Sequence, residues 1–254
     1  MTLAQPIFAG LYRPIRDGAS FPFNLGFMTR TTHDMTKKKL GTWRIDRQLV
    51  EQISRHAAYG RRRKFKKNAV LYEQGEISTR FYFVLKGLVQ ISIFRADGSE
   101  VVLELMGPET ICGEGSAFDG LPRFSSAAAV EDTEAIEFDT SKMTEIFRSH
   151  PEFATSLLRV TSLKQRVVAI RLKHLASREP QDRIMELLTR LEEMFAIDHP
   201  KGRLLVTHVT HEQIATMTGT SRVTVTRTLH RLREQNRIDI VDGHILLKRR
   251  ASAG

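Results

Sequence analysis

The spacing of apolar residues changes along this chain, and each change predicts a different kind of secondary structure. From Trp43 to His56 the apolar positions fall three and four residues apart, which predicts an amphipathic helix. The residues on its buried face are Ile45, Leu49, Ile53 and His56. Short alternating segments separated by turn signals follow, a pattern typical of an antiparallel barrel or jelly roll. The turn signals are Gly75, Gly87, Asp97-Gly98 and Gly107-Pro108.

A helical pattern returns at Ser141, breaks at Pro151 and then runs from about Glu152 to Ala176. In the long helix, apolar residues recur with the spacing of a seam between two helices. The seam residues are Phe153, Val160, Leu163, Val167, Ile170 and His174, with a polar miss at Ser156. We expect this seam to form a homodimer interface, because a long helix that joins two domains has few other surfaces to cover it. The alternative is that the same face packs on the chain's own barrel.

The segment from Val209 to Leu232 has the pattern of a helix-turn-helix. Ile214 and Met217 have helical spacing, and Thr218-Gly219-Thr220 interrupts the helix. A second helix then begins at Ser221, whose hydroxyl suits the N-cap position. The buried face of this second helix is expected at Val225, Leu229 and Leu232.

Another face of this second helix carries the residues expected to read DNA bases. They are Arg222, Val223, Thr226 and Arg227. An arginine can donate two hydrogen bonds to guanine O6 and N7, so arginines near the start of a helix suit readout in the major groove. Thr210, Ser221 and Thr224 are expected to contact phosphates, which fix the register on DNA. The alternative is an ordinary surface helix hairpin with solvated arginines.

Two short strands are predicted around the turn signal Asp242-Gly243, directly after the second helix. A helix-turn-helix followed by a hairpin predicts a winged helix. The fold class is therefore α+β, with an N-terminal antiparallel β-barrel or jelly roll, a long dimerisation helix and a C-terminal winged helix-turn-helix.

Composition narrows the function classes. The chain has 254 residues, enough for two domains, and its net charge of +10 favours polyanions such as nucleic acid or an acidic membrane as partners. No apolar run approaches the roughly 20 residues of a membrane-spanning helix, and no secretory signal pattern is present, so we expect a cytoplasmic protein. A single cysteine, Cys112, excludes an internal disulfide and an all-cysteine metal site. The common catalytic motifs are absent, so we expect no catalytic residues, no metal site and no enzyme activity.

The patterns divide the chain into four parts. They are residues 1–43, an arm that is poorly ordered or precedes the true start; 44–150, an effector domain; 151–177, the dimerisation helix and hinge; and 178–254, a DNA-binding domain. The basic cluster from Arg61 to Lys67 is interpreted as a solvated loop before the first strand, with a nucleic-acid contact as the alternative. Ser177 and Pro180 mark the hinge before another amphipathic helix. Its buried residues are Ile184, Leu187, Leu188 and Leu191.

One stretch of the barrel, from Cys112 to Val130, combines glycines with a glutamate and an arginine. Its glycines, beginning with Gly113, permit a tight turn and close approach of the backbone to a ligand. Main-chain N–H groups there could hold an anion, and Arg123 would supply a planar cation for a phosphate or carboxylate. Glu114 could accept hydrogen bonds from sugar hydroxyls. On its residues alone, such a loop is more often a surface turn, and Cys112 is interpreted as a small buried apolar residue.

The order of barrel, glycine-rich loop, long helix and winged helix resembles the CRP/FNR family of bacterial transcription regulators, over about residues 44–248. Four motifs carry this resemblance. They are Y-E-Q-G-E (Tyr72 to Glu76), F-V-L-K-G (Phe83 to Gly87), G-E with a later P-R (Gly113, Glu114, Pro122, Arg123) and T-S-R-x-T-V-x-R (Thr220 to Arg227). The resemblance implies a cyclic-nucleotide-binding-like barrel that acts on DNA through its winged helices.

By this resemblance Glu114 would hold the ribose 2′-hydroxyl of a cyclic nucleotide, and Arg123 would hold its cyclic phosphate. Ser125 or Ser126 would offer further hydroxyls. Nucleotide-binding members usually carry a small residue where this chain has Phe124.

A second departure lies in the long helix, where Val167 to Ile170 offers no hydroxyl to a purine. The effector is therefore left open between cyclic AMP or cyclic GMP, another small acidic ligand and an empty pocket. The iron–sulfur and haem cofactors of other family sensors are not expected, because the chain has no cysteine cluster and its histidines do not fit as haem ligands.

In the family, the recognition helix carries arginines at the positions of Arg222 and Arg227, and cyclic-AMP-type members have a glutamate at the position of Val223. Val223 can make only an apolar contact, for example with a thymine methyl, so we expect a target that departs from the familiar half-site. A two-fold dimer would bind a near-palindromic operator in double-stranded DNA, with half-sites about one helical turn apart. RNA polymerase is a further partner that the resemblance implies.

The leading hypothesis is a dimeric DNA-binding transcription regulator whose DNA affinity is gated by a small ligand in the barrel. One alternative is a constitutive regulator of the same fold, whose abundance alone sets operator occupancy. Another is a cyclic-nucleotide-binding regulatory subunit that acts on another protein. The operator sequence, and the choice between activation and repression, are left open by the sequence.

Overall fold

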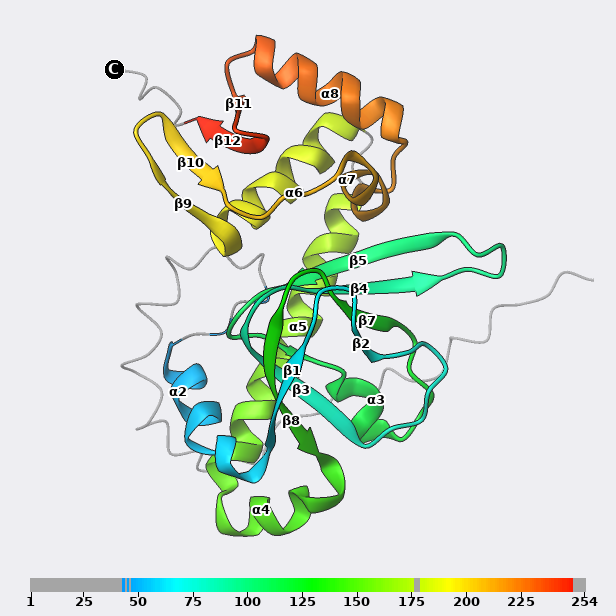
Figure 1. Ribbon diagram of the computed structural model, residues 1–254, viewed down its shortest axis with the longest axis vertical. Coiled ribbons are helices and arrows are strands. Elements are labelled where there is room, and N and C mark those ends of the chain that lie inside the picture. The colour runs from blue at the N-terminus through cyan, green and yellow to red at the C-terminus, as the bar shows by residue number, and fades with distance from the viewer. Residues whose placement is uncertain (1–42, 44, 46, 176–178, 249–254) are drawn as a thin grey trace, which may run out of the picture. The chain divides into compact units, whose positions relative to one another are not determined.

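The computed structural model of the chain describes residues 43, 45, 47–175 and 179–248. In this part the chain forms a β-sandwich, a long helix and a winged helix-turn-helix, which confirms the predicted α+β class (Figure 1). The predicted arm, apart from Trp43, and the predicted hinge residue Ser177 lie outside the described residues. None of the described helices is both long enough and apolar enough to cross a membrane.

Two four-stranded antiparallel sheets form the sandwich. One has the strand order β1-β8-β3-β6 and the other has the order β2-β7-β4-β5. The strands are β1 (Arg61–Phe65), β2 (Val70–Tyr72), β3 (Arg80–Lys86), β4 (Val89–Phe94), β5 (Glu100–Met106), β6 (Ile111–Cys112), β7 (Ser126–Ala129) and β8 (Thr133–Asp139). Strands far apart in sequence, such as β1 and β8, pair as neighbours within one sheet, so the jelly-roll prediction is confirmed.

Strand β3 contributes to two separate hydrophobic cores. Phe81 and Phe83 pack in a cluster with apolar residues of helices α2 and α5, whose bounds are given below. Tyr82 and Val84 belong to a second cluster, with residues of β2, β4 and β7. This division follows from the strand geometry, because successive side chains point to opposite faces of a sheet. The second cluster includes Tyr72 and borders the candidate effector site.

The first described helix, α2 (Arg47–Arg55), begins later than the predicted start at Trp43. It nevertheless buries the predicted face. The buried residues of this face are Ile45, Leu49, Ile53 and His56. A short 3₁₀ helix, η2 (Ala57–Tyr59), then leads into β1.

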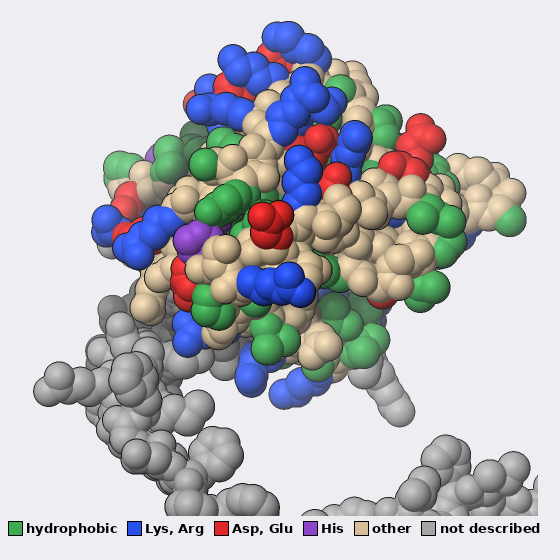
Figure 2. Space-filling model, turned by 90° about the horizontal axis from the view of Figure 1, so that it is seen from below, with side chains coloured by type: hydrophobic (Ala, Val, Ile, Leu, Met, Phe, Trp, Pro, Cys, Tyr) green, Lys and Arg blue, Asp and Glu red, His purple; other side chains and the backbone are tan. Residues whose placement is uncertain are grey.

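The prediction that the basic cluster from Arg61 to Lys67 forms a loop is wrong for most of its length, because Arg61–Phe65 is the edge strand β1. Its cations pair with acids on β8: Arg62 lies 2.6 Å from Glu134, and Arg63 lies 3.3 Å from Glu137. Opposite charges on neighbouring strands allow a run of cations to form a strand. Figure 2 likewise shows Lys and Arg side chains beside Asp and Glu side chains on the face that it displays.

The helical region after β8 breaks at Pro151, as predicted. It consists of the 3₁₀ helix η3 (Thr140–Lys142), α4 (Met143–Ser149) and the long helix α5 (Pro151–Leu175). Both α2 and α4 pack against α5 (Figure 1). Phe153, near the start of α5, stacks on His56 with its ring centroid 4.7 Å away and lies 5.6 Å from the ring of Phe138.

Three of the six residues of the predicted dimer seam on α5 are buried within the chain itself, which favours the alternative that this face packs on the chain's own barrel. Phe153, Val160 and Val167 are buried within the single chain. Phe153 and Val160 belong to the cluster formed with β3 and α2, and Leu163 packs against it. The predicted seam residues Ile170 and His174 are half-buried. A side chain that is already buried in its own core cannot pair with a partner helix.

The exposed side of α5 carries a second apolar stripe. Leu158 is 67% exposed, Val168 46%, Leu172 62% and Leu175 49%. With Thr161 and Gln165, these positions alternate in steps of three and four residues, which is the spacing of a two-helix seam. The helix is therefore apolar on two faces, and among the described residues only one of them is covered.

The C-terminal region is a winged helix-turn-helix. Its helices are α6 (Pro180–Phe195), α7 (His211–Thr218) and α8 (Arg222–Glu234), and its strands are β9 (Ala196–His199), β10 (Gly202–Leu205), β11 (Ile238–Val241) and β12 (His244–Lys248). The four strands form one antiparallel sheet in the order β11-β12-β10-β9, of which the β9–β10 hairpin was not predicted. The predicted buried residues of α6 are confirmed. They are Ile184, Leu187, Leu188 and Leu191.

The predicted wing hairpin is confirmed. β11 and β12 pair antiparallel with Val241 opposite His244. Between them Asp242 and Gly243 both have positive φ, at 49° and 79°. Two residues of positive φ make the turn whose twist matches that of the flanking strands, and Asp-Gly is a preferred pair for it.

Candidate DNA interface and effector site

Helix α7 is fixed at its start by a capping box. The Thr210 hydroxyl oxygen accepts a hydrogen bond from the main-chain N–H of Gln213 at 3.1 Å, and the Gln213 side chain accepts one from the N–H of Thr210 at 2.8 Å. Two N–H groups that would otherwise lack partners are satisfied in this way. The Thr210 hydroxyl is thus a structural cap, and its proton remains free to donate to a phosphate.

The turn between α7 and α8 depends on Gly219. This residue ends α7 in the left-handed conformation, with φ of 59°, which glycine adopts without strain. Arg183 on α6 donates a hydrogen bond to the main-chain oxygen of Thr218 at 2.9 Å and so holds the turn against the rest of the domain. The turn therefore has a fixed geometry, as positioning of the next helix requires.

Helix α8 begins as predicted, with Ser221 as its N-cap. The Ser221 hydroxyl accepts from the N–H of Thr224 at 3.1 Å. The predicted buried face is confirmed by Val225, Leu229 and Leu232. The residues predicted to read bases are exposed on the same helix. They are Arg222, Val223, Thr226 and Arg227.

The exposed face of α8 is tied to α7 through one polar contact. The Nδ1 atom of His211 lies 2.9 Å from the Thr226 hydroxyl, which itself donates to the main-chain oxygen of Arg222. Among the described residues, neither Arg222 nor Arg227 takes part in an ion pair, so both guanidinium groups are free for an anionic or hydrogen-bonding partner. Helix α8 is capped at its start and packed through its buried face. Its exposed face presents two unpaired arginines and the apolar Val223.

A hollow of about 580 Å³ lies between the start of α7, the start of α8 and the wing. Its lining includes Thr210 and Arg222, two of the residues predicted to contact DNA, together with Gly243 of the wing turn. The structure thus brings these parts of the predicted DNA surface together around one concave region.

The candidate effector site is built around Gly113, the residue before helix α3 (Glu114–Asp119). Gly113 has φ of 81°, and a Cβ atom there would lie 2.8 Å from Arg123 Nη1 and 3.0 Å from a ring carbon of Tyr72. Only glycine allows the backbone to turn this close to the two side chains.

Arg123 is 2% exposed and lies inside the barrel. Its guanidinium donates to the main-chain oxygen of Gly113 at 2.7 Å and to that of Arg80 at 2.5 Å. The same group lies 4.1 Å from the centroid of the Tyr72 ring. Its Nε–H is buried and has no hydrogen-bond partner among the described residues. Arg123 is therefore a buried cation with one unsatisfied hydrogen-bond donor, and it lies in the stretch from Cys112 to Val130 that is predicted to bind an anion.

Glu114 is held by a residue that the sequence analysis missed. Lys164 of α5 places its Nζ atom 2.5 Å from Glu114 Oε1 and 2.6 Å from the main-chain oxygen of Ile111. The side chains are 15% and 10% exposed, so the ion pair is largely buried. No local signal identifies Lys164 as a site residue, because the two residues are 50 positions apart.

A second basic side chain of α5, Arg171, lies seven residues beyond Lys164. Arg171 forms an ion pair with the fully buried Glu104 of β5. Lys164 and Arg171 both lie over the ring of Trp43, at 5.1 and 5.0 Å from its centroid. Cations at such distances from an indole face are attracted by the ring quadrupole. Two basic side chains of α5 therefore approach the barrel with Trp43 between them.

The remaining predicted site residues lie close to this centre. Ser125 is buried beside Tyr72, with which its hydroxyl makes a hydrogen bond, and Ser126 accepts a hydrogen bond from the N–H of Gln74 at 2.9 Å. Phe124, at the position where the resemblance implies a small residue beside a phosphate, is 67% exposed. Cys112 is buried, and burial raises the pKa of its thiol to about 12.

Comparison with known proteins assigns the two halves separately. Residues 62–150 match the family described as the cyclic nucleotide-binding domain, and residues 182–252 match the Crp-like helix-turn-helix domain. A relative from Mycobacterium tuberculosis, a CRP-like cAMP-activated global transcriptional regulator, is 33% identical over 166 residues, which cover 65% of this chain and 74% of the relative.

A second relative, a global nitrogen regulator from Synechocystis, is 30% identical over 180 residues, covering 69% of this chain and 79% of the relative. Among solved structures, a mutant of CooA from Carboxydothermus hydrogenoformans has a TM-score of 0.68 at 20% identity. That alignment covers 82% of this chain and 95% of the other. At this identity the structural likeness speaks for the fold alone.

Proposed function

This chain belongs to the CRP/FNR family of bacterial transcription regulators, and we propose that it acts as a homodimer whose affinity for a near-palindromic operator is gated by a small anionic ligand in the barrel. The relatives named above are regulators of transcription rather than enzymes. The domain division at residues 44–150, 151–177 and 178–254, and RNA polymerase as a further partner, are parts of this proposal.

The observation that carries the proposal is the surface of α8. A helix with a buried apolar face, a serine cap and unpaired Arg222 and Arg227 on its exposed side has the form of a recognition helix. Arg222 and Arg227 are suited to guanine, and Val223 is suited to a thymine methyl group. Thr210, Ser221 and Thr224 lie at or near helix starts, where hydroxyl and N–H groups meet phosphates.

Dimerisation is assigned to the exposed stripe of α5 in place of the seam expected from sequence. Leu158, Val168, Leu172 and Leu175 offer exposed apolar side chains along one edge of a 25-residue helix. In a pair of such helices, the polar Thr161 and Gln165 would meet their counterparts within the seam and help to fix its register.

The charges in the barrel favour an anionic ligand. Arg123 and Lys164 place two buried cations near one carboxylate, Glu114, and the Nε–H of Arg123 lacks a partner. A phosphate or carboxylate would satisfy these donors with charge-assisted hydrogen bonds. The hydroxyl groups of Ser125 and Ser126 lie in the same part of the barrel. Cyclic AMP, cyclic GMP and other small acids all offer this chemistry.

Gating follows from the position of Lys164. A ligand whose hydroxyls bind Glu114 would share that carboxylate with the Lys164 ammonium or displace it, and Lys164 lies one helical turn from Val168 in the proposed seam. Ligand binding would therefore alter how α5 is held to the barrel and, with it, the pairing of the two helices. This requires the ligand to bind one arrangement better than the other.

A constitutive regulator is the second candidate, and one observation favours it. Glu114 is already paired with Lys164, and two of the Arg123 donors are already satisfied by main-chain oxygens. A cassette satisfied in this way could serve as a structural core without a ligand. In that case Arg123→Lys would leave DNA affinity unchanged with or without added ligand.

The deciding experiment measures binding of the purified chain to genomic fragments, with and without cyclic AMP, cyclic GMP and a panel of small acids. Selective DNA binding that strengthens with one compound supports the gated regulator and identifies its ligand class. Selective binding that is indifferent to every compound supports the constitutive regulator. Absence of sequence selectivity under all conditions, together with nucleotide binding, would instead favour a regulatory subunit that acts on another protein.

A further inference from the structure

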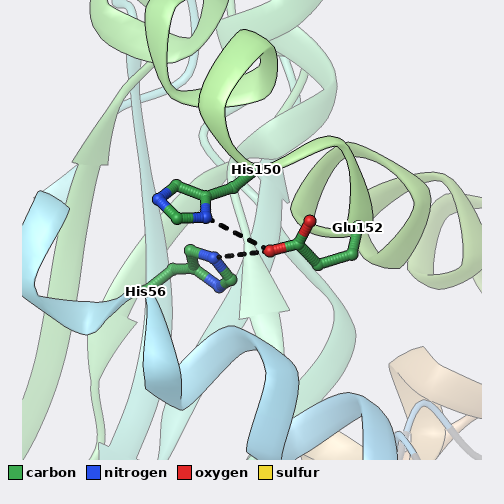
Figure 3. Close-up of side chains that lie close together, drawn as sticks. All are labelled: His56, His150 and Glu152. Carbon is green, nitrogen blue, oxygen red and sulfur yellow. Dashed lines mark hydrogen bonds and ion pairs between the residues drawn. The ribbon is translucent and has the colours of Figure 1, made fainter.

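Three side chains with metal-ligating atoms meet at the junction between α2 and α5. His56 follows α2, His150 lies between α4 and α5, and Glu152 lies in the first turn of α5 (Figure 3). The Nε2 atom of His56 lies 3.3 Å from Glu152 Oε1, and the Nδ1 atom of His150 lies 3.2 Å from the same oxygen. The three potential ligand atoms all lie within 4.8 Å of one another.

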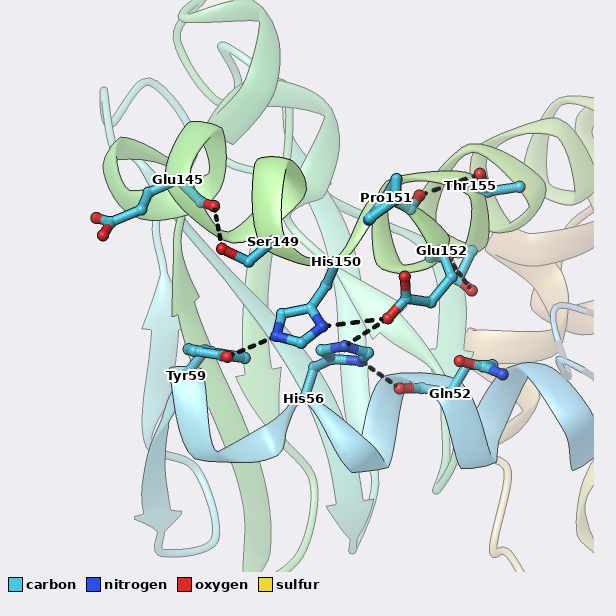
Figure 4. A network of polar contacts seen from close by, with 10 residues as sticks. Gln52, His56, Tyr59, Glu145, Ser149, His150, Pro151, Glu152 and Thr155 are labelled. Atoms are coloured by element: carbon cyan, nitrogen blue, oxygen red, sulfur yellow. Dashed lines mark hydrogen bonds and ion pairs between the residues drawn. The ribbon is translucent and has the colours of Figure 1, made fainter.

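The ring nitrogens that face away from this cluster also have partners (Figure 4). His56 Nδ1 lies 2.8 Å from the main-chain oxygen of Gln52, and His150 Nε2 lies 2.7 Å from the Tyr59 hydroxyl. Metal-binding histidines commonly use the second nitrogen in this way, since such a contact fixes the ring and its tautomer. Both imidazoles are therefore oriented by groups outside the cluster.

The hydrogen bond to Gln52 fixes which ring nitrogen of His56 carries a proton. A carbonyl oxygen can only accept, so Nδ1 must carry the proton in this contact. In the neutral ring, Nε2 then directs a lone pair at the Glu152 carboxylate, which also offers only lone pairs. A bound cation would accept both lone pairs.

The spacing of the cluster fits a transition-metal ion. Two ligand atoms that each lie about 2.1 Å from a tetrahedral ion are roughly 3.4 Å apart. His56 Nε2 and His150 Nδ1 lie 3.3 and 3.2 Å from Glu152 Oε1, close to this value, and the two nitrogens lie within 4.8 Å of each other. Two imidazoles and one carboxylate are also a ligand set that suits zinc and its neighbours, and they leave a further coordination position open.

Solvent can reach the cluster from one side. A hollow of about 160 Å³ adjoins it, and its lining includes Gln52, Glu152 and Arg159. The volume is enough for several water molecules, which take roughly 30 Å³ each. A water from this hollow could complete the coordination. Arg159 is the cation that lines it.

We propose that His56, His150 and Glu152 form a binding site for a divalent transition-metal ion of the zinc class, which would clamp the end of α2 to the start of α5. No metal site is expected from sequence, and local patterns cannot reveal this one, because His56 lies more than 90 positions before the other two ligands and only the fold brings them together. The inference does not rest on the proposed function, since metal binding is measured without DNA or effector.

The test uses the full, tag-free chain after removal of metals with a chelator, titrated with Co²⁺ as a spectroscopic probe. We expect one equivalent of Co²⁺ to bind per chain with the visible absorption bands of nitrogen and oxygen ligation, and Zn²⁺ to displace it. His150→Gln and Glu152→Gln should each weaken Co²⁺ binding by more than about 100-fold, because even partners outside the coordination shell cost 10–100-fold. Both side chains are partly exposed, so the variants should fold, which circular dichroism checks.

The matched control is His230→Gln. His230 forms an exposed pair with Glu234 at 3.5 Å, so it offers a histidine and a glutamate without a third ligand. This variant should bind Co²⁺ like the original chain. The inference is overturned if the original chain binds no stoichiometric Co²⁺, if the double variant of His150 and Glu152 binds it unchanged, or if His230→Gln loses as much affinity as the cluster variants.

Discussion

Lys164 on the long helix α5 places its ammonium 2.5 Å from the carboxylate of Glu114, at the start of α3. Both side chains are largely shielded from water, so each charge depends on the other for stabilisation. The contact joins α5, which carries the proposed dimer seam, to the candidate effector site around Gly113 in the barrel. A ligand that binds the Glu114 carboxylate would therefore compete with Lys164 of α5 for it.

Lys164→Met should lower the free energy of unfolding by about 3 kcal/mol, because removal of one partner leaves a buried carboxylate without compensation. Urea denaturation followed by circular dichroism measures the change. The double variant Lys164→Met with Glu114→Gln should recover part of the loss, since it removes both charges.

The matched control for this pair is Lys66→Met. Lys66 contacts Asp132 at 2.7 Å, a similar distance, but both side chains are mostly exposed. Solvent screens such a pair, so its removal should change stability little. Equal losses for the Lys164 and Lys66 variants would contradict the claim that burial makes the Lys164–Glu114 pair important.

Leu172→Glu should convert the proposed dimer to a monomer, because it places a charge in the apolar stripe on the exposed side of α5. Sedimentation velocity at several protein concentrations measures the oligomeric state. Leu121→Glu is the matched control, since Leu121 is equally exposed at 62% but lies outside α5. A Leu172→Glu chain that remains dimeric while Leu121→Glu dissociates would place the interface elsewhere.

The winged helix could be predicted from sequence because its signals are local. Ser221 caps α8, Gly219 makes the turn, and Asp242-Gly243 makes the wing, all as predicted. Each of these residues acts on its immediate neighbours in the chain, so a short window of sequence contains the whole argument.

The register of α5 could not be predicted in this way. The helix has apolar residues on two faces, and the pattern does not say which face meets the barrel. In the structure, the face that carries Phe153 meets the barrel, and Phe153 stacks on His56 inside the core. Lys164 was missed for the same reason, because its partner Glu114 is brought near only when the barrel and α5 pack together.

Cys112 should be unreactive in the folded chain. Burial raises the pKa of its thiol to about 12, and the thiolate is the reactive form. An aromatic disulfide reagent at pH 8 should label the native chain far more slowly than the chain in denaturant. Cys112→Ser provides the blank. Rapid labelling of one thiol per native chain would contradict the observed burial.

The raised pKa of the Cys112 thiol also makes the folded chain less stable at alkaline pH. In the unfolded chain the thiol ionises at a pKa of about 8.5, below its value in the folded chain. The folded state therefore keeps a proton that the unfolded state loses, so stability falls as pH rises from about 9 towards 12. Cys112→Ala should flatten this part of the stability profile, as measured by denaturation at a series of pH values. A profile with the same slope in both chains would contradict this assignment.

Arg227→Ala should weaken binding to the selected operator by about 1–3 kcal/mol and relax the base preference at one position of each half-site. The reason is that an exposed, unpaired guanidinium on α8 can make a bidentate contact with guanine, which alanine cannot replace. Arg227→Lys is the informative control, since lysine keeps the charge but lacks the planar fork. It should retain the salt dependence of binding and still lose the base preference. A uniform loss of affinity across all operator variants, with the preference intact, would show that Arg227 contacts phosphate and that base readout rests on the other residues of α8.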